Sequence, residues 1–273
     1  MRGSSCLAYS FAMTHAEKFI HYTVTDGIAE ITFDRPPLNL IDTDLVLEYF
    51  AALEVADNDP DVRVVVITGA GKGLSAGMDL KFAEKFDAAE MKAFLRMFYV
   101  ETIERCRALS KPMIAMVHGF AREGACTLAF ACDMVIASDD ATFGYPGVPN
   151  IGAPPGMHTW FLQKLMGRMK AADLIFTGRA ISAAEADRSG LITRVVPRDV
   201  LREETMKLAH DIAAMSPLAL KKAKDFMYQM EDTDCRDVPE AAVEAVSSAF
   251  DTEDSKEARL AFNQKRKPVW TGR

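Results

Sequence analysis

The 273-residue sequence lacks the features that mark several classes of protein. Its five cysteines are odd in number and include no CxxC pair, which argues against a disulfide scaffold or a zinc finger and favours a reduced, cytoplasmic compartment. The five histidines form no HExxH or HxH pattern, so we expect no metal site. Basic residues number 32 against 39 acidic ones, and this net charge of −7 disfavours a nucleic-acid partner. No apolar run reaches the roughly 20 residues that a membrane span needs.

What is present is a chain of ordinary globular composition. Apolar residues make up 49% of it and charged residues 26%, which is enough for a core and too apolar for a disordered chain. Residues 1–17 show no periodicity, so we expect a disordered extension there, with Met13 as a candidate start. We divide the remainder into a core over residues 18–215 and a helical region over residues 216–273.

Strand and helix patterns alternate through the first half of the chain. The alternating segment 20–33 turns at Asp26-Gly27, which predicts a hairpin. Continuous apolar runs predict buried strands at 62–68, 113–117 and 133–137. Helical spacing predicts helices over 42–56, after a glycine-rich loop as far as about Leu109, and within 119–131. This alternation indicates an α/β fold.

After Gly167 the pattern is mostly helical. Ser182 is a typical N-cap of a short helix that ends at Gly190, and Ser216-Pro217 places a cap and a first-turn proline ahead of the next helix. Further helices fit 238–250 and 253–264. Their apolar faces exceed what one core would bury, so we expect a homotrimer or a hexamer built as a dimer of trimers.

The strand at 62–68 runs into a glycine-rich loop, for which we considered three functions. A nucleotide-binding loop needs GxGxxG or a Gly-Lys-Ser/Thr ending, and GAGKGLSAG has neither. The literal GxSxG around Ser75 suggests a serine nucleophile, but the loop begins well before it and the only late histidine, His210, sits in an ordinary helical pattern. The third function is an oxyanion hole, in which backbone N–H groups hold a developing negative charge.

The third function is favoured by a resemblance that covers roughly residues 20–273. GAGKGLSAGMDL resembles the first signature of the crotonase (enoyl-CoA hydratase/isomerase) superfamily, and VHGFAREGACTLAFACDMVIASDDATFGYP resembles the second. Later landmarks follow in order: TGRAISAAEADRSGLITRVVP, SPLALKKAKDFM and FDTEDSKEARLAFNQKRKPVWTGR. The resemblance implies a spiral of ββα turns with a C-terminal helical trimerisation region. It also implies an acyl-CoA thioester as substrate and no separate cofactor.

The resemblance further implies which residues form the site. Carried over, the two oxyanion N–H groups belong to Met78 and Gly124. The CoA moiety is expected along four residues of the loops, with basic residues of the C-terminus near its phosphates, across a subunit boundary where the geometry requires it. These positions are Leu38, Ala76, Asp79 and Leu80, and then Lys265, Arg266 and Lys267. A solvated charge run is the alternative interpretation of the three basic residues.

Three carboxylate positions of the family are empty in this chain. Hydratases place one Glu three residues after the second oxyanion glycine, where this chain has Thr127, and another in an FGxPE pattern, where it has Gly147. Some isomerases carry a Glu further along, where this chain has Pro154 and Pro155. Adding water to an enoyl thioester needs one group to activate the water and one to protonate Cα. Ordinary two-glutamate hydration is therefore not expected.

Three other residues are candidates for proton transfer: Glu123, His158 and Tyr145. Each has a structural alternative, namely an exposed glutamate or one paired near Arg122, a satisfied or surface histidine, and a tyrosine that lines an acyl pocket. Glu123 is the most unusual of them, because the family usually has glycine immediately before the second oxyanion glycine.

Several activities stay open. The leading hypothesis is an acyl-CoA enzyme that holds a thioester enolate with Met78 and Gly124, so that Gly124→Pro would abolish turnover. A decarboxylase or C–C lyase is an alternative, because loss of CO₂ yields the enolate without a strong base. GMDLK and the hydroxyl of Thr127 locally resemble hydroxycinnamoyl-CoA hydratase-lyase, and Gly147 resembles bicarbonate-dependent dihydroxynaphthoyl-CoA synthases. The remaining alternative is a non-catalytic acyl-CoA-binding paralogue.

Overall fold

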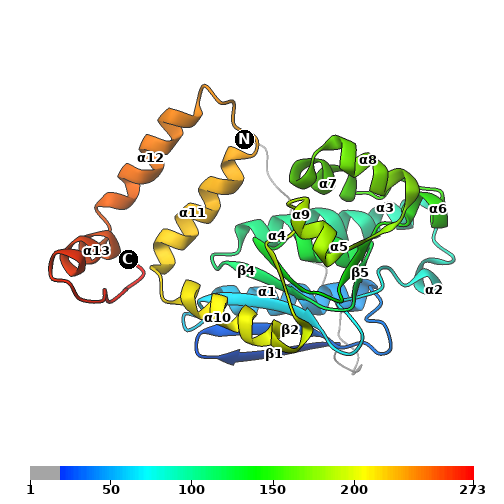
Figure 1. Ribbon diagram of the computed structural model, residues 1–273, viewed down its shortest axis with the longest axis horizontal. Helices are drawn as coiled ribbons and strands as arrows, with labels where there is room; N and C mark the ends of the chain where they lie inside the picture. Colours follow the sequence, from blue (N-terminus) through cyan, green and yellow to red (C-terminus); the bar gives the residue numbers. More distant parts are fainter. Residues whose placement is uncertain (1–18) are drawn as a thin grey trace.

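The computed structural model describes residues 19–273, and the extension expected over residues 1–17 lies outside this range. Two sheets form its centre (Figure 1). The larger sheet has the strand order β1-β2-β3-β4-β6-β9, with β1 (Ile20–Thr25), β2 (Ile28–Phe33), β3 (Val64–Gly69), β4 (Met113–Val117), β6 (Met134–Ser138) and β9 (Arg194–Val196). The smaller sheet has the order β5-β7-β8, with β5 (Phe120–Arg122), β7 (Thr142–Gly144) and β8 (Ala180–Ser182).

Helices connect and cover these strands (Figure 1). Up to the smaller sheet's last strand they are α1 (Thr43–Asn58), α2 (Leu80–Ala83), α3 (Ala88–Leu95), the π-helical η1 (Arg96–Glu101), α4 (Thr102–Ala108), α5 (Gly124–Phe130), α6 (Gly147–Ile151), α7 (His158–Met166) and α8 (Arg168–Thr177). Then follow α9 (Ala183–Arg188), the 3₁₀-helical η2 (Arg198–Val200), α10 (Leu201–Ala213), α11 (Pro217–Met230), α12 (Val238–Phe250) and α13 (Glu253–Asn263). No helix between residues 19 and 273 has both the length and the apolar character to cross a membrane.

The three apolar runs of the sequence form the centre of the larger sheet, as predicted. β3 is buried at all six of its positions, and β2 and β4 both pair with it in parallel. A parallel strand with both faces covered meets no water on either side, so its sequence is a continuous apolar run. The predicted hairpin is confirmed: β1 and β2 pair antiparallel, and Asp26 and Gly27 turn the chain with φ of 50° and 78°.

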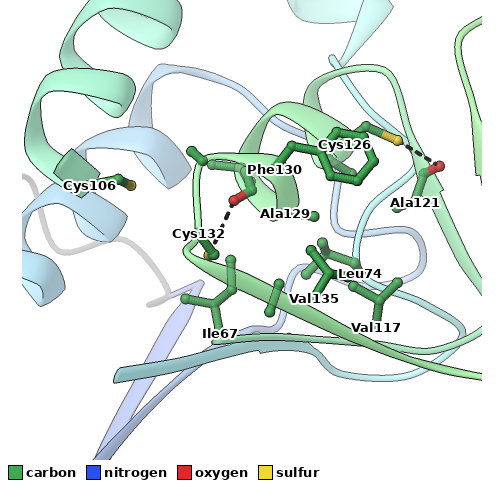
Figure 2. Close-up of a cluster of buried hydrophobic side chains, with 14 of the residues drawn as sticks. Ile67, Leu74, Cys106, Val117, Ala121, Cys126, Ala129, Phe130, Cys132 and Val135 are labelled. Atoms are coloured by element: carbon green, nitrogen blue, oxygen red, sulfur yellow. Dashed lines mark hydrogen bonds between the residues drawn. The ribbon is translucent and has the colours of Figure 1, made fainter. Parts of the chain in front are cut away.

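Two hydrophobic cores lie on opposite faces of the larger sheet. Alternate residues of β3 divide between them, with Ile67 in the larger core and Val66 in the smaller one, which α10 covers. Figure 2 shows the larger core, where Ala129 and Phe130 of α5 lie above the strand residues Ile67 and Val135. The buried packing of α5 fixes the position of its first residue, which belongs to the candidate site.

Three stretches differ from the sequence prediction. The helical pattern expected as far as Leu109 is divided into α2, α3, η1 and α4. The division follows from caps, because the Asp79 side chain caps α2, and Asp87 and Glu90 form a capping box that starts α3. The segment 119–131 contains β5 before α5, and the mostly helical second half contains β8 and β9. Strands of three residues are too short for a periodic pattern to reveal them.

The C-terminal helices extend away from the two sheets (Figure 1). α11 begins at Pro217, and the Ser216 hydroxyl accepts a hydrogen bond from Ala219 N–H, which confirms the predicted cap. The helices predicted at 238–250 and 253–264 are present as α12 and α13. They leave an apolar face open in the single chain, since Val246 is 70% exposed and Phe262 is 84% exposed.

Candidate functional site

Three backbone segments lie side by side at the candidate site: the residues before α1, the end of the glycine-rich loop, and the junction of β5 with α5. Ser75 pairs in parallel with Ala121, and Met78 pairs in parallel with Ile41. Gly77 and Glu123, the residues immediately before Met78 and Gly124, are also in contact, since a Cβ on Gly77 would lie 3.1 Å from the Cβ of Glu123. Segments that are far apart in the sequence therefore bring together the two residues that the family resemblance assigns to an oxyanion hole.

The N–H groups of Met78 and Gly124 have no hydrogen-bond acceptor among residues 19–273. On either side of Met78, the Gly77 carbonyl accepts from Ile41 N–H and the Asp79 N–H donates to the Ile41 carbonyl, each at 2.9 Å. Successive residues of an extended segment point their polar groups to opposite sides, so Met78 N–H points away from Ile41 and toward the β5–α5 side. Gly124 is the first residue of α5, where an N–H has no acceptor within its own helix.

Glycine lets these segments approach closely. Gly77 has φ of 94°, and a Cβ on it would lie 3.1 Å from the Cβ of Glu123. A Cβ on Gly124 would lie 3.0 Å from Ile41 Cδ1 and 3.1 Å from ring atoms of Phe98, which η1 carries. Both contacts are tighter than ordinary packing, so larger residues at either position would separate the two N–H groups.

Asn39, which sequence reasoning did not single out, holds the glycine-rich loop in place. Its buried side-chain N–H₂ group donates to the carbonyls of Ala70, Gly73 and Leu74 at 3.0, 3.2 and 3.1 Å. Its Oδ1 accepts from Arg35 N–H at 2.8 Å. An Asn in a turn is a common sequence feature, and only the fold shows that this amide spans more than thirty residues of chain.

We predict that Asn39→Ala lowers the free energy of unfolding by about 2–3 kcal/mol, because buried carbonyls of the loop lose their donor. Urea unfolding followed by circular dichroism measures the loss. Asn58→Ala is the matched control, since the Asn58 amide also donates to a backbone carbonyl, that of Glu54 at 2.9 Å, but on the exposed surface of α1. Equal losses for the two variants would contradict the assigned role of Asn39.

Glu123 lies directly at the site and has an unusual backbone conformation. Its φ is 44° and its ψ is −112°, a region that residues with a Cβ rarely adopt. Its Oε1 lies 3.4 Å from the position that a Cβ would take on Gly147. The carboxylate therefore fills the space into which a side chain at position 147 would extend, and the two positions, 24 residues apart in sequence, share one location in the site.

The Glu123 carboxyl is poorly solvated and unpaired within the described part of the chain. Burial raises its pKa to about 7. The ion pair near Arg122 that the sequence left open is not formed, because the Arg122 guanidinium donates to the Thr142 carbonyl at 2.7 Å and to the Thr142 hydroxyl at 2.9 Å. Burial, together with the nearby charge of Glu123, raises the pKa of Tyr99 to about 12.

His158 and Thr127 form a buried pair behind the Glu123 backbone. The Thr127 hydroxyl lies 3.3 Å from His158 Nε2, and Nε2–H also donates to the Glu123 carbonyl at 2.9 Å, since a carbonyl oxygen can only accept. Burial lowers the pKa of His158 to about 3, so its ring is neutral near pH 7. A neutral ring with its N–H engaged holds the Glu123 backbone in position and carries no spare proton.

Tyr145, the third proton-transfer candidate, is fully buried. Its ring centroid lies 4.6 Å from that of His158, and its hydroxyl has no hydrogen-bond partner among residues 19–273. Burial raises the pKa of Tyr145 well above its usual value, with the neighbouring Cys126 thiol as a further cause. The hydroxyl therefore keeps its proton near pH 7, and the ring packs beneath the site.

The residues expected along CoA fall into two groups. Leu38 and Ala76 are joined by a 2.9 Å hydrogen bond from Ala76 N–H to the Leu38 carbonyl, and Leu80, at the start of α2, is 59% exposed. Asp79 caps α2 and lies 3.4 Å from Arg35 Nη1. Lys265 and Lys267, together with Arg266, follow α13, which lies at the opposite end of the molecule from α2 (Figure 1). One chain does not bring these basic residues to the site.

Ser75 has a structural role in the loop. Its side chain is buried, and its hydroxyl oxygen accepts a hydrogen bond from Gly77 N–H at 3.0 Å. In the described part of the chain no histidine hydrogen-bonds to it, so the arrangement lacks the base that a serine nucleophile needs. The hydroxyl instead shapes the turn that presents Met78.

The fold and the site define an α/β protein in which a glycine-rich loop meets a short helix, with two backbone N–H groups there that have no acceptor in the described part of the chain. A family model described as enoyl-CoA hydratase/isomerase matches residues 23–273. The chain therefore belongs to the enoyl-CoA hydratase/isomerase family, as the resemblance of its motifs implied.

Individual proteins support this assignment. The chain is 39% identical over 245 residues to the protein named probable enoyl-CoA hydratase echA8 of Mycobacterium bovis, with 89% of this chain and 94% of that protein covered. It is 36% identical to short-chain-enoyl-CoA hydratase of Clostridium acetobutylicum, with 88% and 92% covered. The crystal structure of enoyl-CoA hydratase from Bacillus anthracis has a TM-score of 0.89 and 31% identity, covering 94% of this chain and all of that one. The crotonase-type α/β fold is thus confirmed.

Proposed function

We propose that the chain binds an acyl-CoA thioester and holds the thioester oxygen between the N–H groups of Met78 and Gly124. The observation that carries the proposal is the pair of adjacent backbone donors without acceptors in the described residues. When a proton leaves Cα of a thioester, negative charge moves onto the carbonyl oxygen. Fixed donors in a poorly solvated site stabilise that charge. The reaction class is proton transfer at Cα through an enolate.

We further propose that ordinary hydration of an enoyl thioester is slow, although the named relatives are hydratases. The Thr127 hydroxyl is buried against His158, and Gly147 has no side chain. Activating a water and protonating Cα are two tasks, and among the described residues the site offers one unpaired carboxyl group, that of Glu123, beside the two N–H groups. A decarboxylase would need the same enolate stabilisation, but no feature of this site favours a carboxylated substrate.

For the CoA moiety we propose the surface formed by Leu38, Ala76 and Leu80, which lies next to Met78 along the chain and across the loop. Lys265 and Lys267 reach such a CoA only from a neighbouring subunit. The open apolar face of α12 and α13 supports the trimer or dimer of trimers expected from the sequence.

The experiment uses butyryl-CoA labelled with ¹³C at the thioester carbonyl. A saturated acyl chain has no double bond to hydrate, so it separates enolate formation from water addition. We predict that binding moves the carbonyl ¹³C resonance downfield, because hydrogen bonds polarise the C=O group. We also predict that the purified protein in D₂O exchanges the Cα protons for deuterium.

Two other outcomes have clear meanings. A downfield shift without exchange would favour the non-catalytic acyl-CoA-binding alternative. Binding without any shift would contradict the assignment of the Met78 and Gly124 N–H groups to the carbonyl oxygen.

A further inference from the structure

In the described part of the chain Glu123 has no structural duty for its side chain, although its backbone N–H donates to the Gly144 carbonyl at 3.0 Å and its carbonyl accepts from Cys126 N–H at 2.9 Å. Its φ of 44° disfavours any residue with a Cβ, yet glycine does not occupy the position. Its side chain makes no hydrogen bond or ion pair within residues 19–273, and burial disfavours its charge. A strained backbone and an unpaired, partly buried carboxylate together indicate a residue retained for what its side chain does.

The surroundings of Glu123 direct the carboxylate to the reacting part of the site. The residue immediately precedes Gly124, and its Cβ lies against Gly77, which immediately precedes Met78. Glu123 is therefore next in sequence to the Gly124 donor, and it contacts the residue that precedes the Met78 donor. Its Oε1 extends to the empty side-chain position of Gly147.

The other carboxylate near Met78 is already engaged. Asp79 Oδ1 accepts from the N–H groups of Lys81 and Phe82 at the start of α2, and Oδ2 lies 3.4 Å from Arg35 Nη1. Both oxygens of Asp79 are thus directed to α2 and Arg35 and not to the two N–H donors. Glu123 is thus the available base beside the two donors in the described part of the chain.

We propose that Glu123 is the catalytic residue that removes and returns the Cα proton of a thioester held by Met78 and Gly124. This inference rests on the proposed function and adds to it the identity of the acid–base group. No other carboxylate is required.

The proton and electron balance is simple. The carboxylate oxygen of Glu123 takes the Cα proton, and the electron pair of the C–H bond forms the C=C bond of the enolate as the carbonyl π pair moves to oxygen. The Met78 and Gly124 N–H groups hydrogen-bond that oxyanion. In D₂O the partly buried carboxylic acid of Glu123 exchanges its proton with solvent, so its return to Cα restores the thioester with deuterium at Cα. Return to Cγ of a dienolate instead moves the double bond of an enoyl thioester. One carboxylate completes either cycle without a second reactant.

The test measures deuterium exchange at Cα of butyryl-CoA in D₂O, with the carbonyl ¹³C shift as an independent readout. We expect Glu123→Gln to lower the exchange rate by about 10³-fold while keeping the bound carbonyl shift, since the amide cannot accept the proton. Glu104→Gln, an exposed carboxylate change on α4, is the matched control and should keep the native rate. A Glu123→Gln rate within threefold of the native rate, with the shift kept, would overturn the proposal.

A second pair of variants separates the carboxylate from the backbone at position 123. Glu123→Gly should bind butyryl-CoA and lose exchange, and it should be at least as stable as the native protein, because glycine adopts φ of 44° without strain. Adding Gly147→Glu should raise the exchange rate at least tenfold above that of Glu123→Gly. The new side chain starts 3.4 Å from the place that Oε1 occupied in the native protein. A double variant that polarises the carbonyl but exchanges no faster than Glu123→Gly would contradict the assigned location.

Failure of this inference and failure of the proposed function give different results. If the native protein shifts the carbonyl resonance and exchanges Cα, and Glu123→Gln does both equally well, the oxyanion site stands and Glu123 is not its base. If the native protein leaves the carbonyl resonance unshifted, the proposed function itself is wrong, whatever Glu123→Gln does.

Discussion

Replacing the Gly124 amide by an ester, with glycolic acid in place of glycine, is expected to slow Cα exchange by about 10²–10³-fold. The ester oxygen cannot donate a hydrogen bond, so the enolate oxygen keeps only the Met78 donor. This change adds no Cβ, which would lie 3.0 Å from Ile41 Cδ1 and 3.1 Å from Phe98. It therefore removes the donor while leaving the packing of the site intact.

The matched control is the same amide-to-ester change at Gly71, an exposed glycine of the glycine-rich loop that follows β3. An ester also weakens the preceding carbonyl as an acceptor. At Gly124 that carbonyl belongs to Glu123 and accepts from His158 and from the N–H groups of Cys126 and Thr127, and at Gly71 it belongs to Ala70 and accepts from Asn39. We expect native exchange from the Gly71 ester. If the Gly124 ester exchanged within threefold of this control, its N–H would not be an oxyanion donor.

The second large effect is on pH dependence. Glu123 must be deprotonated to accept the Cα proton, and burial raises its pKa to about 7. The exchange rate should therefore rise about tenfold per pH unit below pH 7 and level off above it. At pH 5, two units below that pKa, the rate should be about 100-fold below the plateau. Initial rates of exchange between pH 5 and 9 measure the profile.

The groups that face Glu123 should not distort this curve. The pKa of His158 is lowered to about 3, and those of Cys126 and Tyr99 are raised to about 12, so all three keep one form between pH 5 and 9. Burial also raises the pKa of Tyr145. A single ionisation is expected, and Glu104→Gln should leave it unchanged. A flat profile, or one that falls as pH rises, would show that Glu123 is not the base.

The raised pKa of Glu123 also makes the stability of the protein depend on pH, in the direction opposite to that of the exchange rate. Because burial favours the protonated form of Glu123, the folded state gains stability that is fully present below the unfolded pKa of 4.5 and is lost as pH rises through about 7. Catalytic readiness and stability at Glu123 thus change in opposite directions with pH, as expected for a group placed for its chemistry.

Much of the fold could be predicted from sequence because the cues are local. The apolar runs of β3 and β4 show strands buried on both faces, and Ser216-Pro217 shows where α11 begins. The three-residue strands of the smaller sheet and the π-helical η1 leave no comparable pattern, since packing against the rest of the chain determines them. The role of Asn39 could not be predicted from sequence either, because its three acceptors lie more than thirty residues away along the chain.

The candidate site, like the fold, could be predicted from sequence only in part. Met78 and Gly124 were proposed through the resemblance of their motifs to the family, and the parallel pairing of Ser75 with Ala121 brings their two segments together. The relation between Glu123 and Gly147 was not visible in sequence. Comparing positions one by one shows a missing carboxylate at 147 and an unexplained one at 123. Only the fold shows that the Glu123 carboxylate occupies the space that a side chain at position 147 would fill.

We propose above all that the site forms a thioester enolate without a second carboxylate. Incubating the purified native protein with butyryl-CoA in D₂O and following the Cα protons by NMR tests it most directly. We expect loss of the Cα proton signals at a rate that depends on protein concentration, with the thioester intact. Unchanged Cα protons, under conditions where the same sample binds butyryl-CoA, would contradict it.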